Sequence, residues 1–337
     1  MKVLFDHPNP FMLAHGGFQI QIEETKKALE AIGVEVEWLR WWDPAQRGDL
    51  IHFFGIPQLS YLRQARSKKI PVVLTHLLTS QCNRSDAKLA LQGTAVKVLQ
   101  SLPGGRTLGN RFGWESLQEA DGIIVGLECE KLALKSIFGI DDKNIYLLPL
   151  GLHDAFLEND RSVPEKKDYL ICSGTITERK RSIELAEMAL LSGIPILFVG
   201  KPYSERAPYW QRFEQLIDQK TVMYKSHIES PYDMARKLRS AKGFVLFSWH
   251  ENWCLSAHEA AACGLPLCVP DQKWSRERFG NEATYLLPKS SPENLRRLVD
   301  FYSRAGELKP PSIGNLNWQS VAAQLLRTYH DICEKSS

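Results

Sequence analysis

Short apolar runs alternate along the chain with segments in which apolar residues recur at helical intervals. Phe18, Ile22 and Leu29 form such a stripe, which ends at Gly33, and a comparable segment of the second half ends at Gly193. The apolar runs predict parallel strands over 2–5, 34–39, 50–54, 72–75, 122–125, 145–148, 169–172, 194–199, 243–247 and 265–269. The same order of strand, helix and strand in both halves predicts an α/β protein with two Rossmann-like domains.

Composition limits the class of protein. The 337 residues suit two domains, and 44% hydrophobic with 24% charged residues is ordinary for a globular chain. A net charge of +3 does not favour a nucleic-acid partner. Seven cysteines without a Cys-x-x-Cys motif predict reduced thiols, and no run is long enough to span a bilayer. The N-terminus has the pattern of a strand rather than of a signal peptide, so we expect a cytoplasmic protein. A peripheral contact with the inner face of the membrane is compatible with this location.

The stretch 247–271 combines a strand, a polar loop, a small-residue helix and a second strand. Glu251 lies in the loop and Glu259 in the helix, at the strand edge where open α/β sheets bind ligands. The free backbone N–H groups of Trp253, Cys254, Leu255 and Ser256 favour a phosphate, and Glu259 suits the paired hydroxyls of a ribose. The alternative is a capping box, in which Glu259 only satisfies the start of a helix capped by Ser256.

A second loop carries clustered positive charge. Gly174 and Thr175 follow the strand 169–172, and Arg179, Lys180 and Arg181 precede the next helix. Cations near a helix N-terminus oppose the helix dipole, so a bound diphosphate would explain them. The alternative is a solvated basic helix start.

Two features of the first half are candidates for ligand contact. Gly16 and Gly17 open the first helix and would let a ligand approach the backbone, although a plain tight turn gives the same pattern. His76 stands at the end of the strand 72–75, where it is either a site residue or a structural histidine.

The segment 81–113 is basic. It contains five cations, Arg84, Lys88, Lys97, Arg106 and Arg111, against the single acid Asp86. Ala87, Leu91, Val98 and Leu102 give a predicted helix an apolar face, and Leu102-Pro103-Gly104-Gly105 ends that helix. A solvated helix with a mobile loop is one interpretation. The other is a basic rim for an anionic acceptor or a membrane surface.

The stretch 247–271 resembles the signature of the retaining glycosyltransferases of family 4, which have the GT-B fold. The matching residues are Ser248, Glu251, Glu259, Ala260, Ala262, Gly264 and Pro266, with seven residues between the two glutamates. Lys180, six residues after Gly174, matches the family's lysine, whereas Thr175 replaces its arginine. Asn252-Trp253-Cys254 replaces Gly-Phe-Gly, and Leu150 and His153 replace Asn and Asp in the turn that joins the domains.

The resemblance implies two Rossmann-like domains facing across a cleft, with residues 1–152 on the acceptor side and 153–315 binding the donor. Residues 158–167 would form a linker, and the helix within 316–337 would return to the first domain. The implied reaction moves a sugar from a nucleotide diphosphate to an acceptor hydroxyl with retained anomeric configuration. The acceptor would be a carbohydrate, a lipid-linked molecule or a small molecule, and a peripheral membrane contact would use residues 84–111.

The predicted site residues follow from these matches. The catalytic group comprises His76, Lys180 and Glu251, and the donor-binding group comprises Gly16, Gly17, Gly174, Thr175, Arg179, Lys180, Gly200, Trp253, Cys254, Leu255 and Glu259. No cofactor and no metal are expected, because the chain has no Asp-x-Asp motif to hold one. The alternatives are an epimerase or a phosphorylase of the same fold, and a nucleotide-sugar-binding module without turnover.

Overall fold

The computed structural model describes residues 1–13, 16–158 and 165–336. The chain divides into two compact units, and it passes between them at Gly151–Leu152 and again at Asn317–Trp318. The sequence placed these boundaries at residues 152/153 and 315/316. Six residues of the predicted linker, 159–164, and His15 at the predicted first helix lie outside the described residues. Within the described ranges, no helix is long and apolar enough to cross a membrane.

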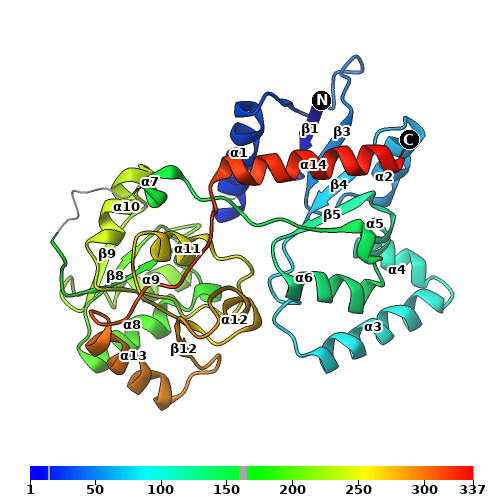
Figure 1. The fold of residues 1–337 in the computed structure, drawn as a ribbon. Coiled ribbons are helices and arrows are strands. Elements are labelled where there is room, and N and C mark those ends of the chain that lie inside the picture. The colour runs from blue at the N-terminus through cyan, green and yellow to red at the C-terminus, as the bar shows by residue number, and fades with distance from the viewer. Residues whose placement is uncertain (14–15, 159–164, 337) are drawn as a thin grey trace. The chain divides into compact units, whose positions relative to one another are not determined.

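The N-terminal unit contains a six-stranded parallel sheet in the order β2-β1-β3-β4-β5-β6 (Figure 1). Its strands are β1 (Lys2–Asp6), β2 (Glu35–Trp38), β3 (Leu50–Phe54), β4 (Val72–Thr75), β5 (Gly122–Val125) and β6 (Ile145–Leu147). Its helices are η1 (Phe11–Leu13), α1 (Gly17–Ala31), α2 (Leu59–Ser67), α3 (Asp86–Ser101), α4 (Gly105–Arg111), α5 (Trp114–Glu119), α6 (Glu128–Ala133), η2 (Leu134–Phe138), η3 (Asp142–Asn144) and α14 (Trp318–Ser336). All residues of β3, β4 and β5 are buried, which explains why parallel strands read as continuous apolar runs.

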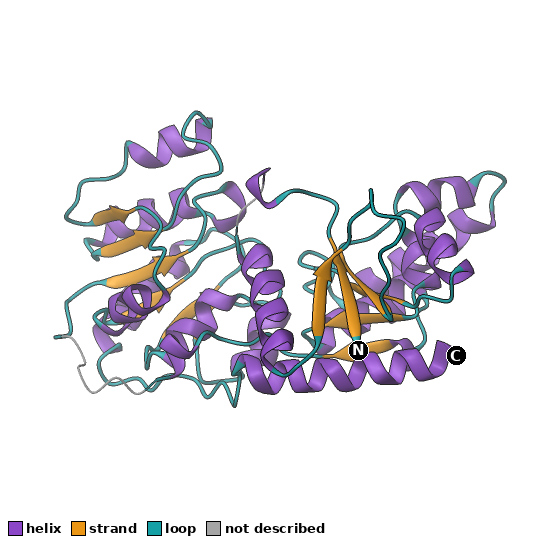
Figure 2. Cartoon of the chain, turned by 90° about the horizontal axis from the view of Figure 1, so that it is seen from above, coloured by secondary structure: helices purple, strands orange, loops and turns teal. Residues whose placement is uncertain are grey.

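The last helix, α14, packs on the sheet of the N-terminal unit, as Figures 1 and 2 show. Tyr329 and Ile332 join the cluster formed by residues of β1, β3 and α1. The Tyr329 hydroxyl lies 2.6 Å from Nδ1 of the buried His52, whose Nε2 lies 2.7 Å from Oγ1 of Thr75. A Cβ on Gly122 would come within 2.6 Å of Ile332, so the glycine allows the helix to approach the strand closely.

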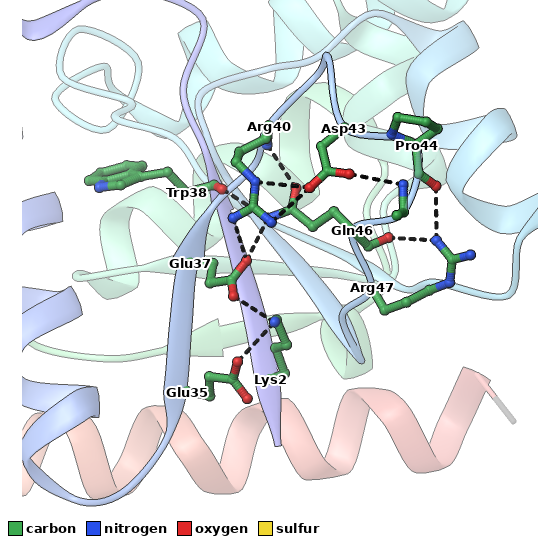
Figure 3. A network of polar contacts seen from close by, with 10 residues as sticks. Lys2, Glu35, Glu37, Trp38, Arg40, Asp43, Pro44, Gln46 and Arg47 are labelled. Atoms are coloured by element: carbon green, nitrogen blue, oxygen red, sulfur yellow. Dashed lines mark hydrogen bonds and ion pairs between the residues drawn. The ribbon is translucent and has the colours of Figure 1, made fainter.

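A polar network fixes the loop that follows β2 (Figure 3). Glu37 accepts from Lys2 at 2.6 Å and from Arg40 at 2.8 Å, and Arg40 also pairs with Asp43 at 2.9 Å. These contacts, led by the bond from Lys2, lower the pKa of Glu37 to about 2. The network therefore holds the loop to the edge strand at neutral pH.

The C-terminal unit contains a second six-stranded parallel sheet, in the order β12-β11-β10-β7-β8-β9. Its strands are β7 (Leu170–Ser173), β8 (Ile196–Val199), β9 (Val222–Lys225), β10 (Gly243–Val245), β11 (Leu267–Pro270) and β12 (Thr284–Leu286). Its helices are α7 (Asp154–Leu157), η4 (Glu178–Lys180), α8 (Ser182–Ser192), α9 (Pro208–Glu214), α10 (Pro231–Arg239), α11 (Leu255–Ala262), α12 (Lys273–Phe279) and α13 (Pro292–Arg304). The predicted α/β class with two Rossmann-like domains is confirmed.

The basic segment differs from its prediction. Helix α3 ends at Ser101, but the expected mobile loop is mostly the short helix α4, which begins at Gly105. The face of α3 that packs inward carries Leu89, Gly93 and Val96. The apolar face that the sequence predicted, with Leu91 and Val98, is exposed instead.

Candidate functional site

Three loops of the C-terminal unit leave the same edge of its sheet. They follow β10, β7 and β8, which are parallel neighbours in the sheet. Residues 174–181 follow β7, Gly200 follows β8, and residues 246–254 follow β10. Open α/β sheets bind ligands at the carboxyl ends of their strands, so this edge is the candidate site.

Glu251, Lys180 and Arg179 form a cluster at this edge. The Lys180 ammonium lies 2.5 Å from Oε1 of Glu251, and Nη1 of Arg179 lies 2.9 Å from the same oxygen. Arg179 also donates to the carbonyl of His250 at 2.8 Å, while the Trp249 N–H donates to the carbonyl of Arg179 at 2.8 Å. The cluster therefore ties the loop after β7 to the loop after β10.

The cluster keeps its charges despite burial. The side chains of Lys180 and Glu251 are only 11% and 7% exposed. Burial by itself raises the pKa of Glu251, but the nearby charges of Lys180 and Arg179 lower it below its usual value. Burial likewise opposes the charge of Lys180, and the attraction of Glu251 raises its pKa above the usual value. Two cations against one carboxylate leave the cluster with one positive charge for an anionic ligand.

The third basic residue of this loop, Arg181, has a structural role, contrary to the prediction that all three cations face a bound diphosphate. Its backbone is left-handed, with φ of 53°, and its side chain is fully buried. The guanidinium donates to the carbonyl of Pro288 at 2.8 Å and lies 3.7 Å from the ring centroid of Phe247. The reversal at Arg181 turns this side chain into the unit, whereas Arg179 and Lys180 reach Glu251.

Gly174 and Gly200 bring two of the loops into backbone contact. A Cβ on Gly200 would lie 2.0 Å from the carbonyl oxygen of Gly174, so no side chain fits there. A Cβ on Gly174 would lie 3.4 Å from Cε of Lys180. Thr175 is partly buried beside them, and the buried Oγ1 of Thr177 has no hydrogen-bond partner among the described residues. The glycines thus shape the loop that carries the basic cluster.

The start of α11 leaves backbone donors unused at Trp253, Cys254, Leu255 and Ser256, the N–H groups that the sequence predicted to be free. The helix begins at Leu255, and Cys254 takes a left-handed conformation with φ of 53°. This is the position of the family's second glycine, so the loop keeps a glycine-like backbone at a cysteine. In the described part of the chain, no N–H of residues 253–256 donates to a backbone carbonyl. These N–H groups form the kind of helix terminus that binds anions.

Glu259 does not cap this helix, so the capping-box alternative is wrong. Because the helix begins at Leu255, Ser256 lies inside it, and no side chain caps the terminus. Glu259 is the fifth residue of the helix, two positions later than a cap at Ser256 would place it, and it is partly buried. Its carboxylate has no hydrogen bond or ion pair to the described residues, and burial raises its pKa to about 7. A carboxylate without a protein partner at this edge can accept hydrogen bonds from a ligand.

The sequence did not reveal the support beneath this loop. The Trp253 indole stacks on the buried His258 ring, with centroids 4.8 Å apart, and the Arg278 guanidinium lies 4.4 Å from the Trp253 ring. Nε of Arg278 lies 3.1 Å from Nε2 of His258, and burial lowers the pKa of His258 to about 3. The indole N–H of Trp253 is buried without a partner among the described residues. Only His258, within the signature, could have indicated this support from the sequence. It follows Cys254 by four residues, which places its ring one helical turn beyond the start of the helix.

The other predicted residues belong to the N-terminal half. Gly16 has a positive φ of 142° and precedes α1, which begins at Gly17. His76 directly follows β4, is partly buried and makes no hydrogen bond to the described residues, and burial lowers its pKa to about 4. His76 is therefore neutral at pH 7. The roles of these three residues stay predictions.

One departure from the family pattern preserves local structure. His153 is the N-cap of α7, and its Nδ1 accepts from the N–H of Ala155 at 3.2 Å. An aspartate at this position would cap the helix in the same way.

In the described ranges, no group of three or more His, Cys, Asp or Glu residues is placed to hold a metal ion.

Comparisons with known proteins agree with this fold. No protein-family model matches the chain. The D-inositol 3-phosphate glycosyltransferase of Arthrobacter sp. (strain FB24) is 24% identical over 359 residues, covering 96% of this chain and 82% of that protein. The sucrose-phosphate synthase of Thermosynechococcus elongatus superimposes with a TM-score of 0.70 at 16% identity, covering 99% of this chain and 100% of that one.

A third similar protein is Anabaena HepE, whose structure was solved in complex with UDP and glucose. It has a TM-score of 0.62 and 14% identity, and the match covers 99% of both chains. These likenesses confirm the GT-B fold that the sequence predicted. Together with the curated relative, they confirm the predicted enzyme class, a glycosyltransferase.

Proposed function

We propose that the protein transfers a sugar from a nucleotide diphosphate to an acceptor hydroxyl, with retained anomeric configuration and without a metal. The donor binds at the edge formed by the loops after β7, β8 and β10. HepE, with the same fold, was solved with UDP and glucose, which supports a nucleotide-sugar donor. The acceptor is a carbohydrate, a lipid-linked molecule or a small molecule.

The roles of the cluster follow from its charges. Negative charge grows on the diphosphate as the bond to the sugar breaks. Lys180 and Arg179 are fixed cations that stabilise this charge without reorganising, and the N–H groups of residues 253–256 add aligned donors. Glu251 holds both cations in place and contacts the sugar hydroxyls. His76 of the N-terminal unit is neutral at pH 7, so its ring has one N–H to donate.

The observation that carries the proposal is the unpartnered carboxylate of Glu259. A partly buried acceptor without a protein partner costs free energy, which a bound ribose would recover by donating two hydroxyls. The test is calorimetric titration of the full chain with a panel of nucleotide diphosphates and their sugars. Turnover with candidate acceptors follows, and the anomeric configuration of the product is read by NMR. A chain that binds none of these ligands would contradict the proposal, and binding without transfer or donor hydrolysis would favour a silent binding module.

Donor affinity should depend on pH through Glu259. Its pKa is raised to about 7 in the fold, and the ionised form accepts ribose hydroxyls best, so affinity should rise about tenfold between about pH 6 and about pH 8. Glu259→Gln should remove this dependence, whereas Glu229→Gln, at an exposed site of the same unit, should keep it. By the same linkage, the ligand-free protein should lose stability as pH rises from 4.5, the usual value, to about 7. A pH profile unchanged by Glu259→Gln would remove this residue from the site.

Transfer should continue in excess chelator, with no gain when magnesium or manganese is added back. The charge that a divalent ion would supply comes from Lys180, Arg179 and the helix start. The assay is sugar transfer after dialysis against chelator, with an established metal-dependent glycosyltransferase as the control. Activity that disappears with chelator and returns with metal would contradict the assignment of the basic loop.

A further inference from the structure

A pocket of about 600 Å³ lies in the N-terminal unit, where β1, β3 and β4 begin. Its polar wall comes from the residues before β3, from the turn between α2 and β4, and from one side of α14. The side chains that matter there are Arg47, Asp49, Lys68, Lys69, His330 and Cys333. Figure 2 shows the start of β1 beside α14. We call this hollow the basal pocket, and its volume is in the usual range of ligand pockets, about 300–1,000 Å³.

Positive charge dominates the wall of the basal pocket. Arg47, Lys68 and Lys69 are exposed, and none of them forms an ion pair with a described residue. The carboxylate in the wall, Asp49, accepts the backbone N–H of Lys2 through Oδ2 at 2.7 Å. Three permanent cations against one carboxylate leave two positive charges, so the pocket is complementary to an anion.

Two further groups of the wall have donors to offer. Arg47 uses Nη1 within its own loop, where it donates to the carbonyls of Pro44 at 3.0 Å and of Gln46 at 2.9 Å (Figure 3). These bonds hold the guanidinium, while Nε and Nη2 make no hydrogen bond to the described residues. The exposed imidazole of His330 on α14 likewise makes none within the described ranges. Both groups can therefore donate to a ligand.

Lys69 occupies a backbone position that favours glycine. Helix α2 ends at Ser67, Lys69 has φ of 58°, and the N–H of Ile70 closes the turn on the carbonyl of Ala65 at 3.1 Å. Glycine is the usual residue at this left-handed position, because a side chain there is sterically disfavoured. Offsetting the negative end of the helix dipole does not require this lysine, since Arg66 already lies in the last turn. Contact of its ammonium with a ligand would offset the backbone cost.

We propose that the basal pocket binds a small phosphorylated molecule, with Arg47, Lys68 and Lys69 around the phosphate and His330 as a further donor. A phosphate ester carries close to two negative charges at pH 7, which matches the surplus of the wall. Its oxygens accept several hydrogen bonds at once, from lysine ammonium groups as well as from an arginine. The proposal goes beyond sugar transfer, because no residue of this wall belongs to the loops after β7, β8 and β10.

Cys333 gives a readout that is confined to the basal pocket. It lines the pocket and is partly exposed, whereas the other six cysteines of the chain are buried. Burial, with Asp49 and Asp121 nearby, raises the pKa of its thiol, so the thiol is neutral at pH 7 and reacts slowly. A molecule bound against Arg47 and the lysines would cover it.

The test is labelling of the full chain with N-ethylmaleimide, with modification of Cys333 followed by mass spectrometry of its peptide. Glycerol 3-phosphate is the probe. At about ten times its Kd, labelling of Cys333 should slow about tenfold, because only the unoccupied fraction reacts. Sodium chloride at the same ionic strength should not slow it. Labelling that stays constant throughout the titration, or that slows equally in chloride, would overturn the proposal.

Matched variants separate the basal pocket from general surface charge. Lys68→Gln with Lys69→Gln should weaken the affinity for glycerol 3-phosphate about tenfold or more, because two charged hydrogen bonds are lost. Lys88→Gln with Lys97→Gln, at two exposed lysines of α3, should leave the affinity unchanged. Equal protection of Cys333 in the two double variants would exclude the lysines of the pocket and overturn the proposal.

A third variant guards against misfolding. Lys69→Gly suits the φ of 58°, so it should not lower the temperature of thermal unfolding, yet it should bind glycerol 3-phosphate more weakly. Unchanged affinity in Lys69→Gly would mean that Lys69 serves only the end of α2. Lys180→Ala should protect Cys333 as the wild type does, so failure of the proposed sugar transfer and failure of this proposal can be told apart.

Titration with orthophosphate in the same assay identifies the source of the phosphate group. Protection of Cys333 by orthophosphate at the concentrations that suffice for glycerol 3-phosphate would support the pocket as a site for free phosphate. Stronger protection by the ester would support a phosphorylated metabolite, because the volume of about 600 Å³ has room for more than the phosphate group.

Discussion

Lys180→Ala should lower kcat by about a hundredfold or more, with a smaller effect on the KM of the donor. The ammonium lies 2.5 Å from Glu251 and is only 11% exposed, so it is held in one place before the donor binds. The charge on the leaving diphosphate is larger in the transition state than in the bound donor. A fixed cation therefore contributes most at the transition state.

A second contribution must be separated from catalysis. Removing one partner of a buried ion pair destabilises a protein by up to about 3–5 kcal/mol when the other charge is left alone. Here Arg179 still contacts Glu251 at 2.9 Å, so the loss should be smaller. Thermal unfolding with and without donor, and kinetics at a temperature where the variant is folded, resolve the two effects. Lys225→Ala, at an exposed lysine at the end of β9, is the control and should keep full activity.

The same pair makes stability depend on pH in a defined way. The lowered pKa of Glu251 contributes stability that is present above its usual value of 4.5 and is lost as pH falls through the folded value. The raised pKa of Lys180 contributes stability that is present below 10.5 and is lost as pH rises through its folded value. Lys180→Ala should therefore flatten both limbs of the stability profile. A variant with wild-type kcat would leave Arg179 as the cation that meets the diphosphate.

The strands and the signature could be predicted from the sequence because both depend on local pattern. Apolar runs that end at glycines mark buried parallel strands, and the spacing of Glu251 and Glu259 is independent of the rest of the chain. The direction of a side chain after a backbone reversal is different. Arg179, Lys180 and Arg181 are equally basic, and only the φ of 53° at Arg181 sends that residue inward.

The environment of a helix was equally hidden. Helix α3 has apolar residues on both sides, so periodicity could not tell which side packs. The side that carries Gly93 packs inward, because the missing side chain lets the helix approach the backbone of Ser136. The role of Glu259 was also ambiguous in the sequence, because a capping box has the same spacing. The capping role was excluded only by the structure, in which the helix begins at Leu255. Such features depend on contacts between segments far apart in sequence.

Gly200→Ala should destabilise the C-terminal unit by roughly 2–6 kcal/mol. Two terms add. The backbone of Gly200 has φ of 149°, a conformation that costs an alanine about 1–3 kcal/mol. The new Cβ would also lie 2.0 Å from the carbonyl oxygen of Gly174, and forcing extra volume into a packed site costs about 1–3 kcal/mol. The neighbour is backbone, so it cannot rotate away as a flexible side chain would.

Thermal and urea unfolding measure this effect, and the matched control is Gly306→Ala. Gly306 has no heavy atom within 4 Å of a built Cβ and no positive φ, so its variant should lie within about 0.5 kcal/mol of the wild type. Relief of the clash in Gly200→Ala would require the loop after β7 to move, and that loop carries Lys180 and Arg179. Folded Gly200→Ala protein should therefore bind the donor less tightly than Gly306→Ala protein. Equal stability of the two variants would mean that the contact between Gly174 and Gly200 does not fix the basic loop.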